Sequence, residues 1–185
     1  VTDDRFKLLS FTGSDVVGWD MKARAGRKKV TLELGGNAAV MIEPDTELND
    51  ALIHRLISGA YNHAGQVCIS VQRILVHQDI FEELKDKLVQ KLQHLKAGDP
   101  DLETTLLGPM IKEAEAKRLH RWMEDAVAQG AHVLTGGEVK GAMFEPILLE
   151  KVDHQLEIYR NEVFGPVAII EAYSDFESGI ACINS

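Results

Sequence analysis

Segments with the composition of strands alternate with amphipathic helical segments along almost the whole chain. This alternation restricts the fold more than any single motif does, because strand–helix–strand units join parallel strands and place helices against the sheet. We therefore expect an α/β fold with a mostly parallel sheet and helices on both of its faces. The expected strands are Lys7–Phe11, Val30–Glu33, Ala38–Ile42, Val71–His77, His132–Leu134, Pro146–Leu149 and Val167–Tyr173.

The expected helices lie between these strands and are marked by caps, stops and apolar residues at helical spacing. They run from Thr12-Gly13-Ser14 to near Gly26, from a cap at Asp45 or Thr46 to a stop at Gly65, from a cap at Asp79 to Gly98 and Pro100, and from Pro109 to Gly130. A last helical pattern contains Cys182 and continues to the final residue. The first residue is not a methionine, so we expect a piece of a longer chain.

Composition limits the classes of function. With 185 residues, 45% of them hydrophobic, the chain can bury a sizeable core. The formal charge of −9 and the scattered basic residues argue against nucleic-acid binding, and no apolar run is long enough to suggest a membrane span. Cys68 and Cys182 are far apart and form no metal-ligand pattern, so we expect no metal site and a reducing, cytoplasmic setting. We expect Cys182 to be a small core residue.

The segment Gly65-Gln66-Val67-Cys68-Ile69 lies where a helical pattern stops and a strand begins. A cysteine at such a junction can be half-exposed at the mouth of a cleft, where its thiolate acts as a nucleophile. Two other interpretations stay open. Cys68 can be buried and inert, as cysteines commonly are, or it can pair with His63 as in a cysteine hydrolase, although such partners are normally distant in sequence.

An acidic residue, Glu33, ends an expected strand in Leu32-Glu33-Leu34-Gly35-Gly36. The carboxyl ends of parallel strands gather at one rim, which makes a meeting of Glu33 with Cys68 possible. One reaction open to such a pair, which these residues alone do not select, is attack of the thiolate on an aldehyde carbon, loss of hydride to leave a thioester, and its hydrolysis by a carboxylate-activated water. Alternatively, Glu33 is a solvent-facing residue of an edge strand, and Gly35-Gly36 forms only a tight turn.

Together with Asn161-Glu162-Val163-Phe164-Gly165-Pro166-Val167, these segments resemble the catalytic half of the NAD(P)-dependent aldehyde dehydrogenases. The resemblance implies that Cys68 is the nucleophile and Glu33 the general base. It implies that Glu162 holds the ribose hydroxyls of the nicotinamide half and that Phe164 lines the nicotinamide pocket. Without the resemblance, Glu162 is equally well a surface charge.

Two further segments of the chain share the resemblance. Phe11-Thr12-Gly13-Ser14, followed by Val17-Gly18, is similar to the helix that faces the cofactor pyrophosphate, which implies cofactor contacts at Gly13 and Ser14. The resemblance implies that Leu34 and Gly35 bind the cofactor together with Gly13 and Ser14. Gly108-Pro109-Met110-Ile111 matches another family segment, interpreted as structural.

The family implies residues 1–34 as the end of a cofactor-binding domain and residues 35–185 as a catalytic domain, incomplete at its C-terminus. It also implies NAD or NADP as cofactor, a small-molecule aldehyde as substrate and a homo-oligomer. The segment Cys68–Ile74 looks more like members that act on small or phosphorylated hydroxyaldehydes. The chain has no G-x-G-x-x-G, and we expect these 185 residues alone to be inactive.

Two alternatives from other classes remain at this stage. One is a non-enzymatic binding or assembly module that retains the fold. The other is a related enzyme that transfers the thioester to coenzyme A, which Glu33 disfavours because that transfer needs no water-activating carboxylate.

Overall fold

The computed structural model describes residues 1–184, which form two units, one over residues 1–36 and one from residue 37 onward. In the first unit, strand β1 (Leu8–Thr12) pairs in parallel with β2 (Lys29–Glu33), and helix α1 (Asp15–Arg24) connects them. A Cβ atom added at Gly18 of α1 would lie 2.4 Å from Leu34 Cδ2, so the helix packs closely against the Leu34 side chain after β2.

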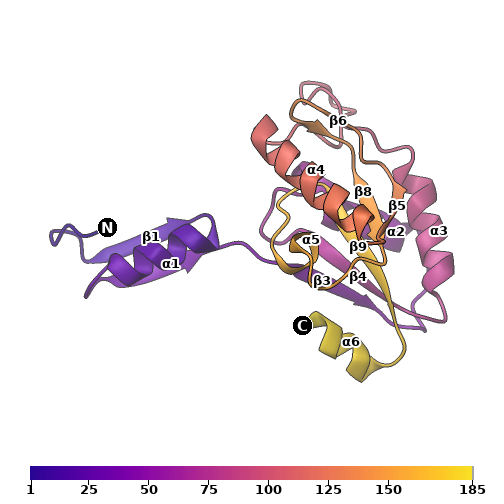
Figure 1. Ribbon diagram of the computed structural model, residues 1–185, viewed down its shortest axis with the longest axis horizontal. Helices are drawn as coiled ribbons and strands as arrows, with labels where there is room; N and C mark the ends of the chain where they lie inside the picture. Colours follow the sequence, from indigo (N-terminus) through magenta and orange to yellow (C-terminus); the bar gives the residue numbers. More distant parts are fainter. Residues whose placement is uncertain (185) are drawn as a thin grey trace. The chain divides into compact units, whose positions relative to one another are not determined.

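The second unit is built on a five-stranded sheet in the order β3-β4-β9-β8-β5 (Figure 1). Its strands are β3 (Ala38–Ile42), β4 (Val71–His77), β9 (Val167–Tyr173), β8 (Ile147–Glu150) and β5 (His132–Thr135). The first four are parallel, and β5 joins the edge of β8 in antiparallel orientation. The prediction of a mostly parallel sheet is therefore confirmed.

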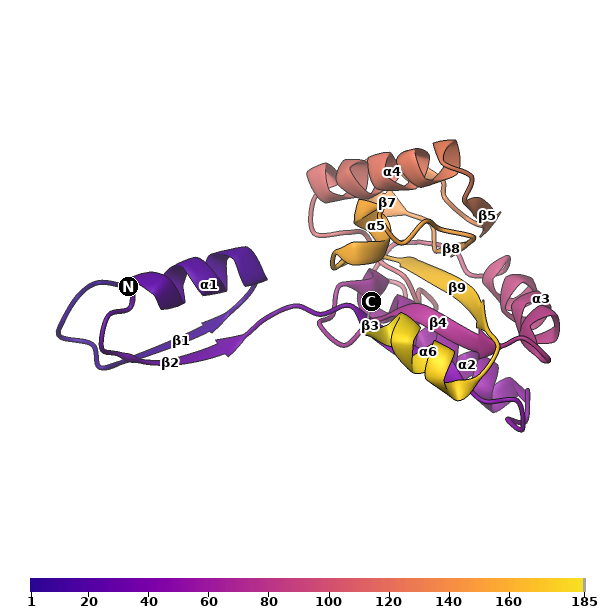
Figure 2. The same cartoon turned by 60° about the horizontal axis from the view of Figure 1, so that its bottom comes forward.

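Helices cover both faces of this sheet, as expected. On one face lie α2 (Asp50–Tyr61), which continues into the 3-10 helix η1 (Asn62–Gly65), and α3 (Phe81–Leu92); on the other lie α4 (Glu113–Ala128) and α5 (Glu157–Arg160) (Figures 1 and 2). Helix α6 (Phe176–Ile183) follows β9, and the short strands β6 (Val139–Lys140) and β7 (Met143–Phe144) form a separate hairpin. None of the helices in residues 1–184 has the length and apolarity to cross a bilayer.

Strand β9 shows why both faces are buried. Ala168 and Ile170 belong to the core under α2 and α3, whereas Val167 and Ile169 belong to the core under α4 and α5. Alternate side chains of one strand thus enter two different cores, because successive side chains of a strand point to opposite faces. An apolar run rather than an alternating pattern is the sequence signature of such a strand.

The starts of two central helices differ from the sequence prediction. Helix α2 is capped by Asn49, whose Oδ1 accepts from Leu52 N at 3.0 Å, and not by Asp45 or Thr46. Thr46 instead belongs to a turn in which its N–H donates to Glu43 O at 3.1 Å. Helix α3 begins at Phe81 after Ile80, one residue beyond the expected cap at Asp79.

The start of α4 at Pro109 was also predicted wrongly, since the helix begins at Glu113 after Lys112. The segment before it is held by other parts of the chain. Met110 N donates to Ala142 O at 2.9 Å, and Ile111 N donates to the side-chain Oε1 of Gln66 at 2.8 Å. These bonds satisfy the backbone outside a helix, so the preference of proline for a first helical turn does not decide the outcome.

Candidate active site

Cys68 lies in the turn that separates η1 from β4, and its side chain is exposed. The turn is closed by Ser70 N, which donates to Val67 O at 2.9 Å. The Ser70 hydroxyl donates to Ala60 O at 3.0 Å and so ties the end of the turn to α2. The thiol is therefore presented on an anchored turn and is open to small molecules.

The backbone before this turn has an unusual conformation. His63, Ala64 and Gly65 have φ of 51°, 56° and 66°, so three consecutive residues adopt the left-handed region. This conformation costs a non-glycine residue on the order of 1 kcal/mol, and such strain is concentrated at functional sites. A Cβ atom on Gly65 would lie 2.0 Å from Gly165 O, so the close approach of these two segments requires glycine.

That approach brings the Cys68 turn against the Glu162–Pro166 segment. A cavity of about 830 Å³ lies beside both, and Phe164, a residue that is 41% exposed, lines it. Gln66 forms part of its wall and fixes the neighbouring wall through the bond that it accepts from Ile111 N. The cavity is lined by Asn62, His63, Gln66, Val67, Pro100, Thr105, Leu106, Gly108, Pro109, Ile111 and Phe164.

Gln72 of β4 holds the loop that carries Glu162. Its side chain is only 4% exposed, and its Nε2 donates to Ile158 O at 3.1 Å and to Asn161 O at 2.8 Å. Its Oε1 accepts from Val163 N at 2.9 Å. The three bonds bracket Glu162, which is itself partly buried. Gln72 was not predicted as a site residue; the available signal was an amide beside Arg73 in an expected buried strand, where polar side chains must find partners.

The site lies at the opposite end of the sheet from the one considered in the sequence analysis. Cys68 precedes β4, and Glu162 and Phe164 precede β9, which is parallel to β4. These residues therefore lie at the amino ends of the strands, and the prediction that Cys68 lies at the carboxyl rim of the sheet is wrong. Cys68 lies on the connection that leads from η1 into β4 and not on a loop that follows a strand.

In the first unit, the residues predicted to bind the cofactor do lie together. β1 ends at Thr12 opposite Glu33, the last residue of β2, and Gly13 N donates to Glu33 O at 3.0 Å. Ser14 is the N-cap of α1, and the Glu33 side chain is exposed. Leu34 follows and packs against α1, with Gly35 next to it in sequence. Here the carboxyl ends of parallel strands do collect the candidate residues.

Arg73 is a buried cation of the second unit, 5% exposed. Its Nε donates to Asn37 Oδ1 at 3.1 Å, and its terminal nitrogens donate to Cys182 O at 3.0 Å and Ile183 O at 3.1 Å. A guanidinium at the carbonyl end of α6 is favourable both as a donor and toward the helix dipole. The prediction that Cys182 lies on a final helix is confirmed, but it is half-buried among polar groups and is not an apolar core residue.

Known proteins resemble this chain along its whole length. A model of the aldehyde dehydrogenase family matches residues 1–185. A 3-sulfolactaldehyde dehydrogenase of Priestia aryabhattai is 42% identical over 178 residues, which cover 96% of this chain and 37% of that protein. The chain therefore spans little more than a third of the length of such curated relatives.

Solved structures agree in fold. An aldehyde dehydrogenase of Physcomitrella patens, crystallised with the reaction product succinate, superimposes with a TM-score of 0.93 at 47% identity, over 97% of this chain and 38% of that one. A betaine aldehyde dehydrogenase of Staphylococcus aureus in complex with NAD+ gives a TM-score of 0.89 at 30% identity, over 96% of this chain and 37% of that one.

Proposed function

Because this chain belongs to the aldehyde dehydrogenase family, we propose that it forms the part of an NAD(P)-dependent enzyme that carries the nucleophile for oxidising an aldehyde to a carboxylic acid. The observation that supports this most is the exposed Cys68 turn, anchored at both ends and pressed against the Glu162–Phe164 segment through Gly65. An inert structural cysteine would not need a strained, glycine-dependent approach to present its thiol.

In the proposed reaction, the Cys68 thiolate attacks the aldehyde carbon and forms a carbon–sulfur bond, which turns the planar carbonyl into a tetrahedral thiohemiacetal. NAD or NADP, when bound, accepts the hydride that leaves this carbon. The carbon then remains on Cys68 as a thioester. Backbone N–H groups of the turn, including that of Cys68, are proposed to stabilise the oxyanion while the tetrahedral species exists.

Glu33 is proposed as the base that completes the cycle. Its carboxylate takes a proton from water, the water oxygen attacks the thioester carbon, and the carbon–sulfur bond breaks. The carboxylic acid leaves and Cys68 regains its thiolate. Glu33 belongs to the first unit and Cys68 to the second, so their partnership is a proposal drawn from the family and not from a distance.

The residues near Cys68 suit a nicotinamide cofactor. The exposed Phe164 lines an open cavity that could receive a planar ring, and the partly buried Glu162, two residues earlier in the chain, offers a carboxylate for ribose hydroxyls. In the first unit, the N-terminal end of α1 at Ser14 offers N–H groups to a phosphate. The residues proposed to hold the cofactor are Gly13, Ser14, Leu34, Gly35, Glu162 and Phe164.

The proposed substrates are small or phosphorylated hydroxyaldehydes, from the sequence Cys68–Ile74. The relative that is 42% identical is named for 3-sulfolactaldehyde, a small acidic hydroxyaldehyde, which supports this class.

The test is made on the longer polypeptide that contains these 185 residues and extends to the length of the relatives. Cys68→Ala and Cys68→Ser should abolish NAD(P)H formation with unchanged circular dichroism. Turnover above a few per cent of the parent rate in either variant would refute the role of Cys68.

Glu33→Gln should allow one burst of NAD(P)H and then stall, because an amide cannot accept the proton of water. Glu47→Gln, at an exposed site outside the proposed machinery, is the matched control and should show steady turnover. Steady turnover of Glu33→Gln without a burst would remove Glu33 from the mechanism. Steady turnover of the parent that requires added coenzyme A would show instead that the thioester is transferred to that thiol.

A further inference from the structure

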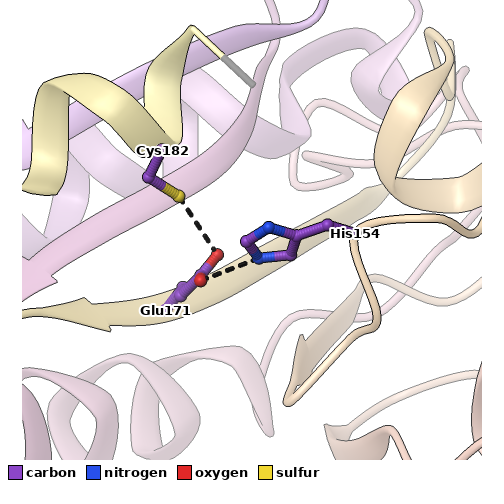
Figure 3. A group of neighbouring side chains, drawn as sticks. All are labelled: His154, Glu171 and Cys182. Atoms are coloured by element: carbon purple, nitrogen blue, oxygen red, sulfur yellow. Dashed lines mark hydrogen bonds and ion pairs between the residues drawn. The ribbon is translucent and has the colours of Figure 1, made fainter.

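Three side chains that the proposed reaction does not use converge on the α4–α5 face of the sheet (Figure 3). His154 lies in the loop between β8 and α5, Glu171 on β9, and Cys182 on α6. His154 Nε2 lies 2.8 Å from Glu171 Oε1, and Cys182 Sγ lies 3.5 Å from Glu171 Oε2. We propose that His154, Glu171 and Cys182 bind one divalent transition-metal ion of the zinc type.

The donor set selects the class of ion. A histidine nitrogen, a carboxylate oxygen and a cysteine sulfur are the three ligand types of protein-bound zinc, whereas magnesium and calcium take oxygen ligands and do not favour sulfur. Three protein ligands leave the fourth tetrahedral position to water. No metal site was expected from the sequence because Cys68 and Cys182 are far apart, and His154, Glu171 and Cys182 show no recognisable metal-binding spacing.

The distances suit a tetrahedral ion. Bonds of about 2.0–2.3 Å at tetrahedral angles place ligand atoms roughly 3.3–3.7 Å apart. All three ligand atoms already lie within 4.8 Å of one another, and the sulfur–oxygen distance of 3.5 Å is within that range. The histidine and the cysteine approach different oxygens of Glu171, so binding one ion requires side-chain rotations that bring the nitrogen, one carboxylate oxygen and the sulfur to this spacing.

The surroundings orient the ligands and leave them accessible. The imidazole of His154 stacks on the ring of Tyr159, with centroids 4.0 Å apart and planes inclined by 13°. The Tyr159 hydroxyl donates to Glu171 Oε2 at 3.1 Å. Tyr159 therefore orients both the imidazole of His154 and the carboxylate of Glu171. The side chains of His154 and Glu171 are 39% and 30% exposed, which gives an ion a path from solvent. Such supporting contacts typically tune metal affinity.

Charge and proton balance are consistent with binding. Burial raises the pKa of the Cys182 thiol, so the metal-free cluster carries a thiol proton. Binding forms a metal–sulfur bond, and that proton passes to solvent. The carboxylate and the thiolate then balance the two charges of the ion. Arg73 is the nearby opposing cation, and its donors are directed to the carbonyls of Cys182 and Ile183 and to Asn37.

The first experiment measures zinc and cobalt binding to the 185-residue chain with Cys68→Ser, which removes the exposed second thiol. We expect one ion per chain with a Kd of about 1 µM or tighter, by competition with a chromophoric chelator. The cobalt complex should show a thiolate-to-metal charge-transfer band, which only Cys182 can supply in this background. Absence of that band, or of saturable binding, overturns the proposal. Because His154, Glu171 and Cys182 are all intact in this variant, a negative result cannot come from a damaged cluster.

The second experiment tests the assigned ligands. His154→Gln and Cys182→Ser should each weaken zinc binding at least about tenfold. The matched control is His132→Gln, because His132 Nδ1 also pairs with a glutamate, Glu150, at 3.2 Å but has no cysteine in its cluster. Zinc should raise the Tm of the control and not that of the ligand variants. Equal affinity in all three variants would show adventitious surface binding and overturn the proposal.

Discussion

Replacing Gln72 by methionine tests the loop clamp described above. Methionine approximates the length and volume of glutamine, so the change removes three hydrogen bonds with little change in packing. It leaves Val163 N–H and the carbonyls of Ile158 and Asn161 without their partner. The bonds to Val163 and Ile158 are buried, whereas the Asn161 carbonyl lies near the surface, where water can replace the lost donor.

The magnitude follows from these environments. A buried backbone group left without a partner costs about 1–3 kcal/mol, so two such groups lower the free energy of unfolding by about 3 kcal/mol, with the surface carbonyl adding little. For a urea m value of about 2 kcal/mol/M, the unfolding midpoint should fall by about 1.5 M. The matched control is Gln90→Met on the exposed face of α3, which should change stability by less than about 0.5 kcal/mol.

The assay is urea unfolding of the 185-residue chain in a Trp19→Phe background, so that fluorescence reports on Trp122 of α4 and thus on the second unit. Circular dichroism provides the second probe for two-state behaviour. A loss for Gln72→Met no larger than that for Gln90→Met would refute the argument that these bonds hold the loop around Glu162.

Three further results are expected. Gly65→Ala should prevent the native approach of the Cys68 turn, because its Cβ would overlap the carbonyl oxygen of Gly165. The control Gly141→Ala, at a similar φ of 62° but with open space around it, should lower the free energy of unfolding by only about 1 kcal/mol. Equal urea midpoints for the two variants would contradict this. Burial alone would raise the pKa of Glu150, but hydrogen bonds from His132 and Lys85 outweigh it and hold that pKa below 4.5. The stabilisation is therefore present above pH 4.5 and is lost as the pH falls through the native pKa, so Glu150→Gln should flatten the acid side of the stability profile; an unchanged slope speaks against this linkage. The 185-residue chain alone should bind NAD and NADP no more tightly than about 1 mM, since each missing hydrogen bond to ribose or phosphate costs about 1–3 kcal/mol, and micromolar affinity by isothermal titration would disprove this.

The bounds of three strands of the sheet were predicted correctly. β3, β4 and β9 contain the apolar stretches 38–42, 74–76 and 167–170, which leave few alternative strands. The helix starts were less predictable, since several polar residues near each start compete for the cap. At Pro109 the competition was decided by Gln66 and Ala142, which are distant in sequence and invisible to any local rule. The two-residue strands β6 and β7 are too short to show a period.

The candidate site was predictable where chemistry is local to a motif. The Cys68 segment was identified as a thiol between a helical pattern and a strand, the Glu162 segment through the family resemblance, and the structure brings the two segments together. The partners of Gln72 and the cluster of His154, Glu171 and Cys182 could not be predicted. Their contacts depend on which strands become neighbours and on which face each side chain enters, and neither is encoded within a short window.

The anchored turn has an entropic consequence for reactivity. Gly65 at one end and Ser70 at the other are fixed when the protein folds, so the few residues between them have little freedom left to lose. Ordering a flexible residue costs about 1–2 kcal/mol, and here that cost falls on folding and not on the encounter with substrate. A lengthened turn would keep the same thiol, yet each encounter would first have to restrict its motion, so the proposed nucleophile should lose rate without losing any of its contacts.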